Sequence, residues 1–295
     1  MLTTEYAVAV QGADILGEVP LWCERTKKLW WTDVRRPAIQ SYDPATGKHS
    51  AVRLAADMLA GSIALREAGG LLLATNRGLF TYDPQKTEAP VFLMNPEEHL
   101  PQNRLNDGKV DRAGRFWVGS MKDGVREPAG NFYRFDPDHS CHFQFDGVNV
   151  PNSISWSPDS RTMYFADTHV QLIWAFDFDL DDGVMSKRRV FKDWTGTPAK
   201  PDGSTIDADG CLWNAMVGTG QVVRLTPQGK VDRIVQLPIT NATCPAFGGD
   251  ALDTLYITSH SQRLTPEQAA KEPLAGSLFV VNPGVKGLPE TRFRG

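Results

Sequence analysis

The sequence repeats one pattern six times, and this repeat limits the possible folds more than any other feature. Each copy has an apolar entry segment, a turn with Gly or Asp, a segment rich in Leu, Trp, Phe or Tyr, and a closing segment. Six units of about 45 residues, each with three or four short strands, predict an all-β fold, a six-bladed β-propeller. The entry segments carry these residues at equivalent positions, with spacings of 44, 44, 46, 50 and 42: Glu18, Ser62, Asn106, Asn152, Asp202 and Cys244.

The turn residues and the ends of the chain agree with this fold. Asp-Gly, Gly-Gly, Ala-Gly and Asp-Pro pairs recur at short intervals, which favours hairpins over helices. No linker interrupts the repeat, so residues 1–295 are expected to form a single propeller domain. The segment before Gly17 is expected to add a strand to the last blade, which would close the ring and cover a sheet edge. One helical turn is predicted over Pro266–Lys271, with Thr265 as its N-cap.

Two further features are interpreted as structural. Trp22, Trp156 and Trp213 are expected to pack in the core between blades rather than to stack on a sugar. Residues 177–183 resemble the start of an EF-hand loop, but Gly183 is one place late and Arg188 occupies the position of the bidentate Glu. This segment is therefore predicted to be a hairpin.

The composition excludes several classes of protein. The formal net charge is −4, so there is no basic excess to neutralise the phosphates of a nucleic acid or a membrane surface. No basic-then-apolar signal segment and no run of about 18 apolar residues are visible, so a cytoplasmic protein is expected. The cysteines are far apart, which favours isolated thiols over a zinc site or disulfides.

Three oxygen-donor side chains share one phase of the repeat: Glu18, Asn152 and Asp202. The innermost strands of a propeller line its axis, so residues at one phase lie on one ring around that axis. Two carboxylates and an amide oxygen suit a hard cation such as Ca²⁺, Mg²⁺ or Mn²⁺, with positions left open for water or substrate. Each of these residues alone, next to a proline, is also typical of a turn or a cap.

These motifs resemble those of the SMP-30/gluconolactonase family, which includes regucalcin, over nearly the whole chain. The resemblance implies a six-bladed propeller, with Glu18, Asn152 and Asp202 as ligands of one divalent metal ion. It also implies that Arg104 and Asn106 contact the substrate. The residues that carry it are Gly17-Glu18-x-Pro20-x-Trp22, Asn103-Arg104-x-Asn106-Asp107-Gly108-Lys109-x-Asp111, Gly119-Ser120-Met121, Asn152-Ser153-x-Ser155-Trp156-Ser157-Pro158-Asp159 and Pro201-Asp202-Gly203.

The chain departs from the family pattern at three places. Val19 and Ser153 stand where relatives often have Gly. Some relatives have a substrate-binding Glu shortly after the third motif, and Asp123 is the nearest acid here. Asp123 is therefore carried over as a third substrate-binding residue.

The resemblance implies hydrolysis of a sugar-acid lactone to the aldonic acid. A divalent ion would stabilise the developing oxyanion, and Asp202 is the hypothesised general base. Arg104 has a fork of donors suited to paired substrate oxygens, although it could instead pair with Asp107 or Asp111 in a turn. No G-x-S-x-G elbow, H-E-x-x-H motif or P-loop offers another catalytic site.

Several alternatives stay open. The substrate could be gluconolactone, galactonolactone, xylonolactone or arabinonolactone, and the metal Ca²⁺ first, or Zn²⁺, Mn²⁺, Mg²⁺ or Fe²⁺. The base could be Asp202 or a metal-bound water alone. A non-catalytic calcium-binding scaffold, or an esterase acting on organophosphates or aryl esters, would use the same fold. The pattern leaves the oligomeric state open.

Overall fold

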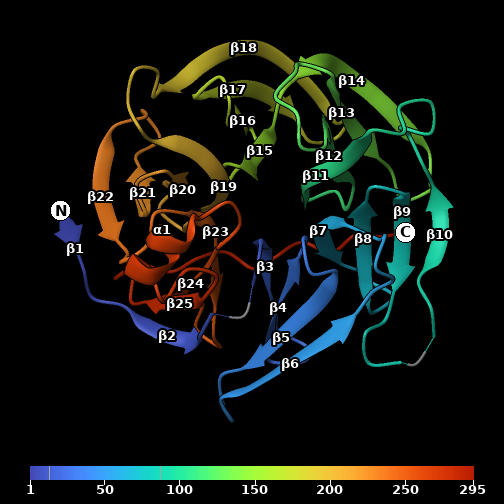
Figure 1. Cartoon of the computed structure of the whole chain (residues 1–295). Helices are drawn as coiled ribbons and strands as arrows, with labels where there is room; N and C mark the ends of the chain where they lie inside the picture. Colours follow the sequence, from blue (N-terminus) through green and yellow to red (C-terminus); the bar gives the residue numbers. More distant parts are fainter. Residues whose placement is uncertain (13, 87) are drawn as a thin grey trace.

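The computed structural model describes residues 1–12, 14–86 and 88–295, and these form six sheets arranged around a central axis (Figure 1). All strand pairs within these sheets are antiparallel except the parallel pair of β1 with β22. This arrangement confirms the predicted six-bladed β-propeller. In the first three blades the strands follow one another from the axis outward, as four-stranded meanders. These strands are β3 (Gly17–Cys23), β4 (Lys28–Asp33), β5 (Ala38–Asp43) and β6 (Lys48–Arg53); β7 (Ala60–Leu65), β8 (Leu71–Thr75), β9 (Gly78–Tyr82) and β10 (Val91–Met94); β11 (Asn103–Val110), β12 (Phe116–Lys122), β13 (Gly130–Phe135) and β14 (Cys141–Val148).

The other three blades have the same meander, and the N-terminal segment adds strands to two of them. The strands are β15 (Pro151–Trp156), β16 (Thr162–Asp167), β17 (Leu172–Asp179) and β18 (Val184–Asp193); β19 (Lys200–Ile206), β20 (Leu212–Val217), β21 (Gln221–Leu225) and β22 (Val231–Gln236), with β1 (Leu2–Thr3) outside; β23 (Ala242–Gly248), β24 (Thr254–Ser259) and β25 (Leu278–Val281), with β2 (Ala7–Val10) outside. Strand β2 pairs antiparallel with β25, so the start and the end of the chain meet in one blade.

The predicted details outside the site are confirmed. Helix α1 (Pro266–Lys271) begins after Thr265, whose hydroxyl accepts a hydrogen bond from the backbone N–H of Gln268 in a capping box. Residues 177–183 span the hairpin between β17 and β18. No helix within the described residues is long and apolar enough to cross a bilayer.

Each inner strand has an irregularity near its first residues, where the register shifts by a bulge. The residues after two predicted ligands, Val19 (φ 48°) and Ser153 (φ 59°), have left-handed backbones within these bulges. This conformation favours glycine and is strained for a β-branched residue, which explains why the resemblance expects Gly at both positions. At Gly203 the reason is space, because a Cβ would lie 2.4 Å from Sγ of Cys244.

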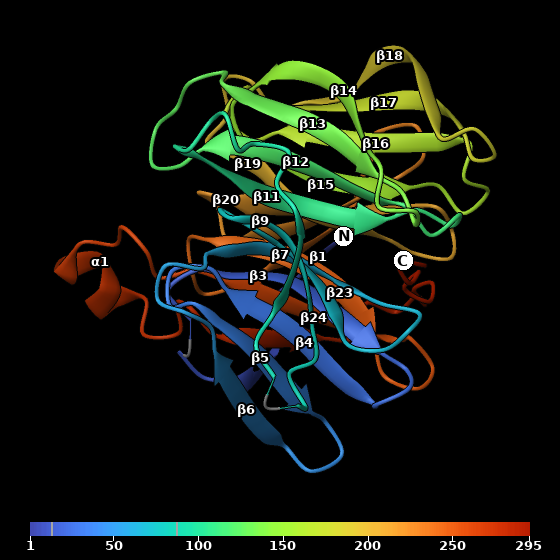
Figure 2. The same cartoon turned by 90° about the vertical axis from the view of Figure 1, so that its right-hand side faces the viewer.

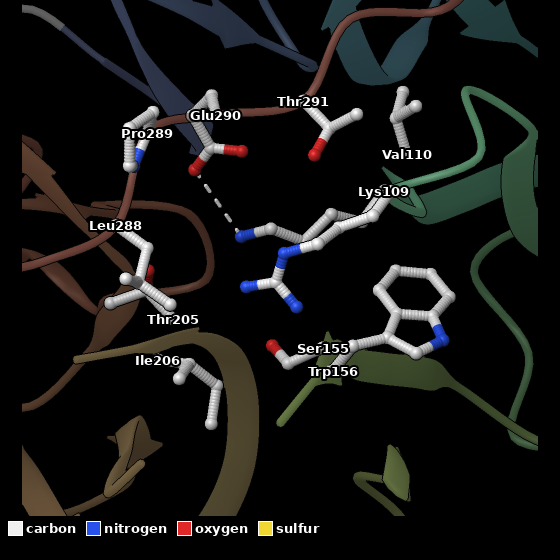
Figure 3. Close-up of a pocket in the computed structure, with 11 residues that line it drawn as sticks. Lys109, Val110, Ser155, Trp156, Thr205, Ile206, Leu288, Pro289, Glu290 and Thr291 are labelled. Atoms are coloured by element: carbon white, nitrogen blue, oxygen red, sulfur yellow. Dashed lines mark ion pairs between the residues drawn. The ribbon is translucent and has the colours of Figure 1, made fainter. Parts of the chain in front are cut away.

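The two faces of the ring carry different segments. Helix α1 projects from one face, and the C-terminus lies on the opposite face (Figure 2). After β25 the chain crosses that opposite face, forming bridges between Gly287 and Asp207 and between Phe293 and Arg66. Nζ of Lys109 lies 3.4 Å from a carboxylate oxygen of Glu290, and this pair borders a small cavity of about 50 Å³ (Figure 3). The C-terminal segment therefore covers this end of the axis.

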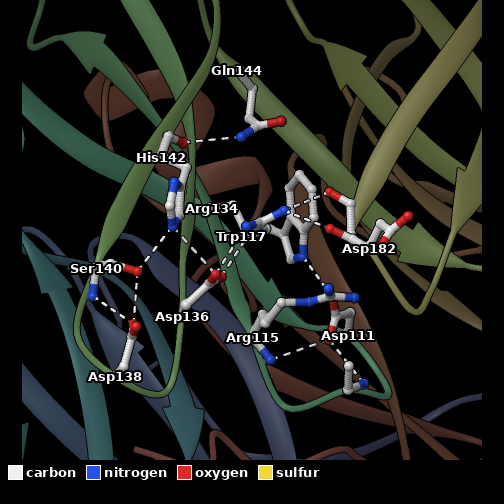
Figure 4. A network of polar contacts seen from close by, with 12 residues as sticks. Asp111, Arg115, Trp117, Arg134, Asp136, Asp138, Ser140, His142, Gln144 and Asp182 are labelled. Atoms are coloured by element: carbon white, nitrogen blue, oxygen red, sulfur yellow. Dashed lines mark hydrogen bonds and ion pairs between the residues drawn. The ribbon is translucent and has the colours of Figure 1, made fainter.

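The core lies between the blades, where large side chains from neighbouring sheets pack together. Trp22, Trp156 and Trp213 are buried, as predicted. The fully buried Trp117 donates from its indole nitrogen to Asp111 at 2.9 Å, and the guanidinium of Arg115 donates to the same carboxylate at 2.7 Å (Figure 4). Such pairs satisfy the polar ends of core side chains, as a buried indole requires.

Candidate active site

A pocket of about 180 Å³ opens where the inner strands begin. Its walls include five of the predicted site residues, which come from β3, β11, β15 and β19: Glu18, Arg104, Asn106, Asn152 and Asp202. The segment before α1 contributes His260, Gln262 and Arg263 to the same pocket. The symmetry of the ring thus brings Glu18 and Asp202, which are 184 positions apart in the sequence, to one cavity.

Asp202 is the most informative residue of this pocket. It is only 7% exposed, and within the described chain its Oδ1 has no hydrogen-bond partner. Burial, followed by the charge of Asp107, raises the pKa of Asp202 well above its usual value. Burial also raises the pKa of Glu18, and the charges of Asp202 and Asp107 add to that effect. Buried carboxylates that repel one another and have no donor for one oxygen are suited to a cation.

The amide of Asn152 is held by its neighbours. Its Nδ2 donates to Oγ1 of Thr168 at 2.7 Å, and that hydroxyl donates to the backbone carbonyl of Pro201 at 2.6 Å. Its Oδ1 accepts a hydrogen bond from Nδ2 of Asn106 at 3.2 Å. This network fixes the orientation of the amide and leaves its oxygen with one long contact from the protein. Orienting partners of this kind are typical around metal ligands.

The three oxygen donors fit a hard divalent cation by their chemistry and by the unpartnered Oδ1 of Asp202. In the described residues no three His, Cys, Asp or Glu side chains are grouped as metal ligands, so the set depends on the amide of Asn152. Three protein ligands leave open positions, as catalytic sites require.

Arg104 is buried and points its donors in three directions. Its Nε donates to Asp123 at 3.0 Å, and its Nη1 donates to Oδ1 of Asn106 at 2.6 Å and to the backbone of Leu105 at 3.2 Å. Its Nη2 has no hydrogen bond to the parts of the chain that the structure covers, and Arg104 lines the pocket. The expected alternative, a pair between Arg104 and Asp107 or Asp111, is wrong, because Arg104 pairs with Asp123.

Asp123 is engaged by two guanidinium groups and is not among the residues that border the pocket. Arg35 donates to it from Nη1 at 2.8 Å and from Nη2 at 2.5 Å, in addition to the bond from Arg104. Burial opposes ionisation of Asp123, but the hydrogen bonds and charges of Arg35 and Arg104 outweigh it and lower its pKa to about 2. Asp123 is therefore a permanent anion that holds both arginines.

Two residues near the pocket were not singled out from the sequence. Asp107 is buried, its carboxylate accepts a long bond of 3.3 Å from the backbone of Ile154, and burial raises its pKa to about 6. Asp107 belongs to one of the motifs that resemble the family, so the sequence could have marked it as a site residue. The direction of its side chain could not be predicted from that motif. Thr168 lies in a turn after β16, and nothing in the sequence marked it as a site residue.

The fold and the pocket define a six-bladed β-propeller with a carboxylate-lined pocket at the start of its inner strands. Residues 16–261 match the family model described as SMP-30/Gluconolactonase/LRE-like region, and the chain belongs to this family. The predicted family is thereby confirmed. Membership of this family supports hydrolysis of a sugar lactone at the level of the family.

The similar proteins include an enzyme and a protein described as calcium-binding. The chain is 34% identical over 289 residues to a 6-deoxy-6-sulfogluconolactonase of Pseudomonas putida, with 97% of each chain covered. It is 34% identical over 287 residues to regucalcin of Xenopus laevis, with 95% of each covered. The crystal structure of regucalcin from Agrobacterium tumefaciens, described as a calcium-binding protein, superposes with a TM-score of 0.95 at 30% identity and covers 100% of this chain and 99% of its own.

Proposed function

We propose that this protein is a metal-dependent lactonase that hydrolyses a sugar-acid lactone to the aldonic acid. As a member of its family it is a hydrolase of carboxylic ester bonds. The observation that carries the proposal is the buried, unpartnered Oδ1 of Asp202, in a pocket shared with Glu18 and Asn152. A carboxylate left in this state is costly unless a ligand compensates it.

Glu18, Asn152 and Asp202 would hold the cation. When bound, a divalent ion supplies Lewis-acid stabilisation of the negative charge that develops on the lactone carbonyl oxygen. Ca²⁺ is the first choice, because the ligands are all hard oxygens and the A. tumefaciens neighbour is described as calcium-binding. Mn²⁺, Mg²⁺, Zn²⁺ and Fe²⁺ are the other ions to test.

The protein's own groups have distinct roles in this proposal. Asp202 takes the proton from the attacking water through a carboxylate oxygen, and the bound cation lowers the basicity of this carboxylate. Arg104 donates from Nη2 to a substrate oxygen, and Asn106 borders the same part of the pocket. Asp123 acts as a positioning residue, since it holds Arg104 and Arg35 rather than the substrate.

The substrate class is the aldonolactones, namely the lactones of gluconate, galactonate, xylonate and arabinonate. Several hydroxyls and one ring ester suit a small pocket of about 180 Å³ with mixed donors and acceptors. The name of the P. putida relative describes a gluconolactone with a sulfonate at carbon 6, which adds a sulfonated lactone to the substrates to be tested.

The test is a lactone panel with metal-stripped protein to which each cation is added back. We expect hydrolysis of at least one aldonolactone only with metal, and its loss in Glu18→Gln. Glu67→Gln is the matched control, because Glu67 is exposed and pairs with Arg25 on the surface. Metal binding without hydrolysis of any lactone would instead favour a calcium-binding scaffold. Hydrolysis that survives complete metal removal would contradict the proposal.

A further inference from the structure

The pocket has a positively charged border that the proposed chemistry does not use fully. Five cationic side chains border it or reach into it: Arg35, Arg104, Arg126, Lys200 and Arg263. The whole chain has a formal net charge of −4, so this concentration is local and not a consequence of a basic protein. A cleft bordered by one sign of charge attracts ligands of the opposite sign.

Two of these cations are already compensated, and three are not. Arg35 and Arg104 share the carboxylate of Asp123. Arg126, Lys200 and Arg263 have no ion-pair partner within residues 1–12, 14–86 and 88–295. The three uncompensated side chains are therefore available to a ligand.

The uncompensated cations come from three different blades. Arg126 lies in the connection after β12, Lys200 begins β19, and Arg263 lies between β24 and α1. They border one small pocket from separate parts of the ring, so a single ligand group can be approached from more than one side. Guanidinium and ammonium groups arranged around an anion form charge-assisted hydrogen bonds, which are stronger than neutral ones.

The acidic residues of the pocket do not compensate the charge of these three cations. Glu18 and Asp202 also border the pocket, and both are assigned to the cation in the proposed function. If Glu18 and Asp202 bind a divalent ion, that ion neutralises their negative charge, and the border of the pocket stays positively charged. The remaining positive charge then favours an anion on the substrate itself.

We infer that this pocket selects a sugar-acid lactone with an anionic substituent remote from the ring ester, bound by Arg126, Lys200 and Arg263. The inference rests on the proposed function and adds the chemical class of the substrate. Sulfonate, phosphate and carboxylate share the required chemistry. A sulfonate or phosphate presents three oxygens and a carboxylate two, so the preference among them depends on how many of the three cations can reach the group.

The experiment compares matched substrates. It measures kcat/KM of the metal-loaded protein for glucono-1,5-lactone, its 6-phosphate, its 6-deoxy-6-sulfonate and a 6-carboxylate lactone. We expect at least one anionic lactone to exceed the neutral one by roughly 10- to 100-fold, as hydrogen bonds to charged groups allow. Added salt lowers this preference, because the cations are near the surface.

Substitutions test whether Arg126, Lys200 and Arg263 cause the preference for an anionic lactone. In the triple variant Arg126→Gln, Lys200→Gln, Arg263→Gln the ratio of anionic to neutral kcat/KM is expected to fall towards one, mainly through KM. The matched control is Lys48→Gln with Arg53→Gln, two cations on the outer strand β6. Circular dichroism and thermal unfolding establish that both variants are folded.

The outcomes separate the two claims. A neutral lactone hydrolysed as well as every anionic one, or a ratio unchanged in the folded triple variant, would overturn the inference and leave the lactonase intact. Failure to hydrolyse any neutral or anionic lactone would overturn both. A ratio that favours phosphate, sulfonate or carboxylate supports the inference and identifies the substituent.

Discussion

The two ends of strand β19 hold aspartates in opposite states. Asp207, which directly follows the strand, is fully buried and accepts four hydrogen bonds: from the backbone N–H groups of Asp209 at 3.0 Å and Cys211 at 2.9 Å, the indole of Trp213 at 2.8 Å and the guanidinium of Arg224 at 2.7 Å. Asp202, near the start of the strand, is also buried, but its Oδ1 accepts none from the described residues.

The third blade repeats this contrast. Asp111 follows β11 and accepts bonds from Ala113, Arg115 and Trp117. Asp107, four residues earlier, has one long contact with a backbone N–H. At one end of the inner strands the acids are saturated by donors of their own blade and hold the blade together. At the other end Asp107 and Asp202 have few donors, which is the arrangement expected of a ligand site.

The largest expected effect is on activity. Asp202→Asn removes both a metal ligand and the proposed base, so we expect kcat/KM to fall by roughly 10³-fold. The metal-free protein is expected to be as stable as the wild type or more so, because the variant removes a buried carboxylate that lacks donors. Steady-state kinetics and denaturant unfolding without metal measure the two effects. A variant that retains full activity with metal bound would remove Asp202 from the role of base.

The matched substitution at the other end of β19 is expected to act on stability instead. Asp207→Asn leaves Arg224 and Trp213 with weaker acceptors, and we expect it to lower the free energy of unfolding by roughly 2–4 kcal/mol. Arg224 keeps its contacts with Asp209 and Asp232, which limits the loss. Activity per folded molecule should stay close to that of the wild type. Similar losses of stability in Asp202→Asn and Asp207→Asn would contradict the proposed difference between the two ends of β19.

Asp123 tests whether the site itself contains a structural acid. Asp123→Asn removes the partner of the buried Arg104, and we expect a loss of about 1.5–3 kcal/mol. The pKa of Asp123 in the folded protein is about 2, below the ordinary value of 3.8 for Asp, so the contribution is present above about pH 4 and is lost as pH falls towards 2. Thermal unfolding of both proteins between pH 3 and 7 should show a difference that shrinks in acid. A difference independent of pH would contradict the assigned ionisation.

The smallest effect is expected at the covered end of the axis. Glu290→Gln leaves Lys109 without its carboxylate, and we expect a loss of about 1 kcal/mol because the pair is partly exposed. Lactone hydrolysis should not change, since this pair lies on the face opposite the pocket. A large loss of activity in a folded Glu290→Gln protein would indicate that both ends of the axis take part in function.

The periodic features of the molecule could be predicted from the sequence. The repeat fixes which residues occupy one level of the ring, so it predicted the blades and the common pocket of Glu18, Asn152 and Asp202. Local signals sufficed for α1, where Thr265 and Pro266 mark the helix start. The tryptophans predicted to be buried lie in the entry strand of their blade (Trp22 and Trp156) or in the second strand (Trp213).

Features that depend on bulges and long-range contacts could not be predicted. Asp107 and Asp111 are the same residue type in one motif, and the bulge between Leu105 and Gly108 decides which of them faces the axis. The partner of Asp123, Arg35, is 88 positions away on another blade. The alternative pairing of Arg104 was wrong because its partner, Asp123, follows the neighbouring strand β12 and is not in the turn that was considered.

The most direct test of the central claim is a calorimetric cation titration of metal-stripped wild type, Asp202→Asn and Asp207→Asn. We expect at least one of Ca²⁺, Mn²⁺, Mg²⁺, Zn²⁺ and Fe²⁺ to bind with one ion per chain to the wild type and to Asp207→Asn, and to bind more weakly to Asp202→Asn, which replaces a charged ligand with a neutral amide. Equal binding to both variants, or a wild type that binds none of these ions, would contradict this expectation.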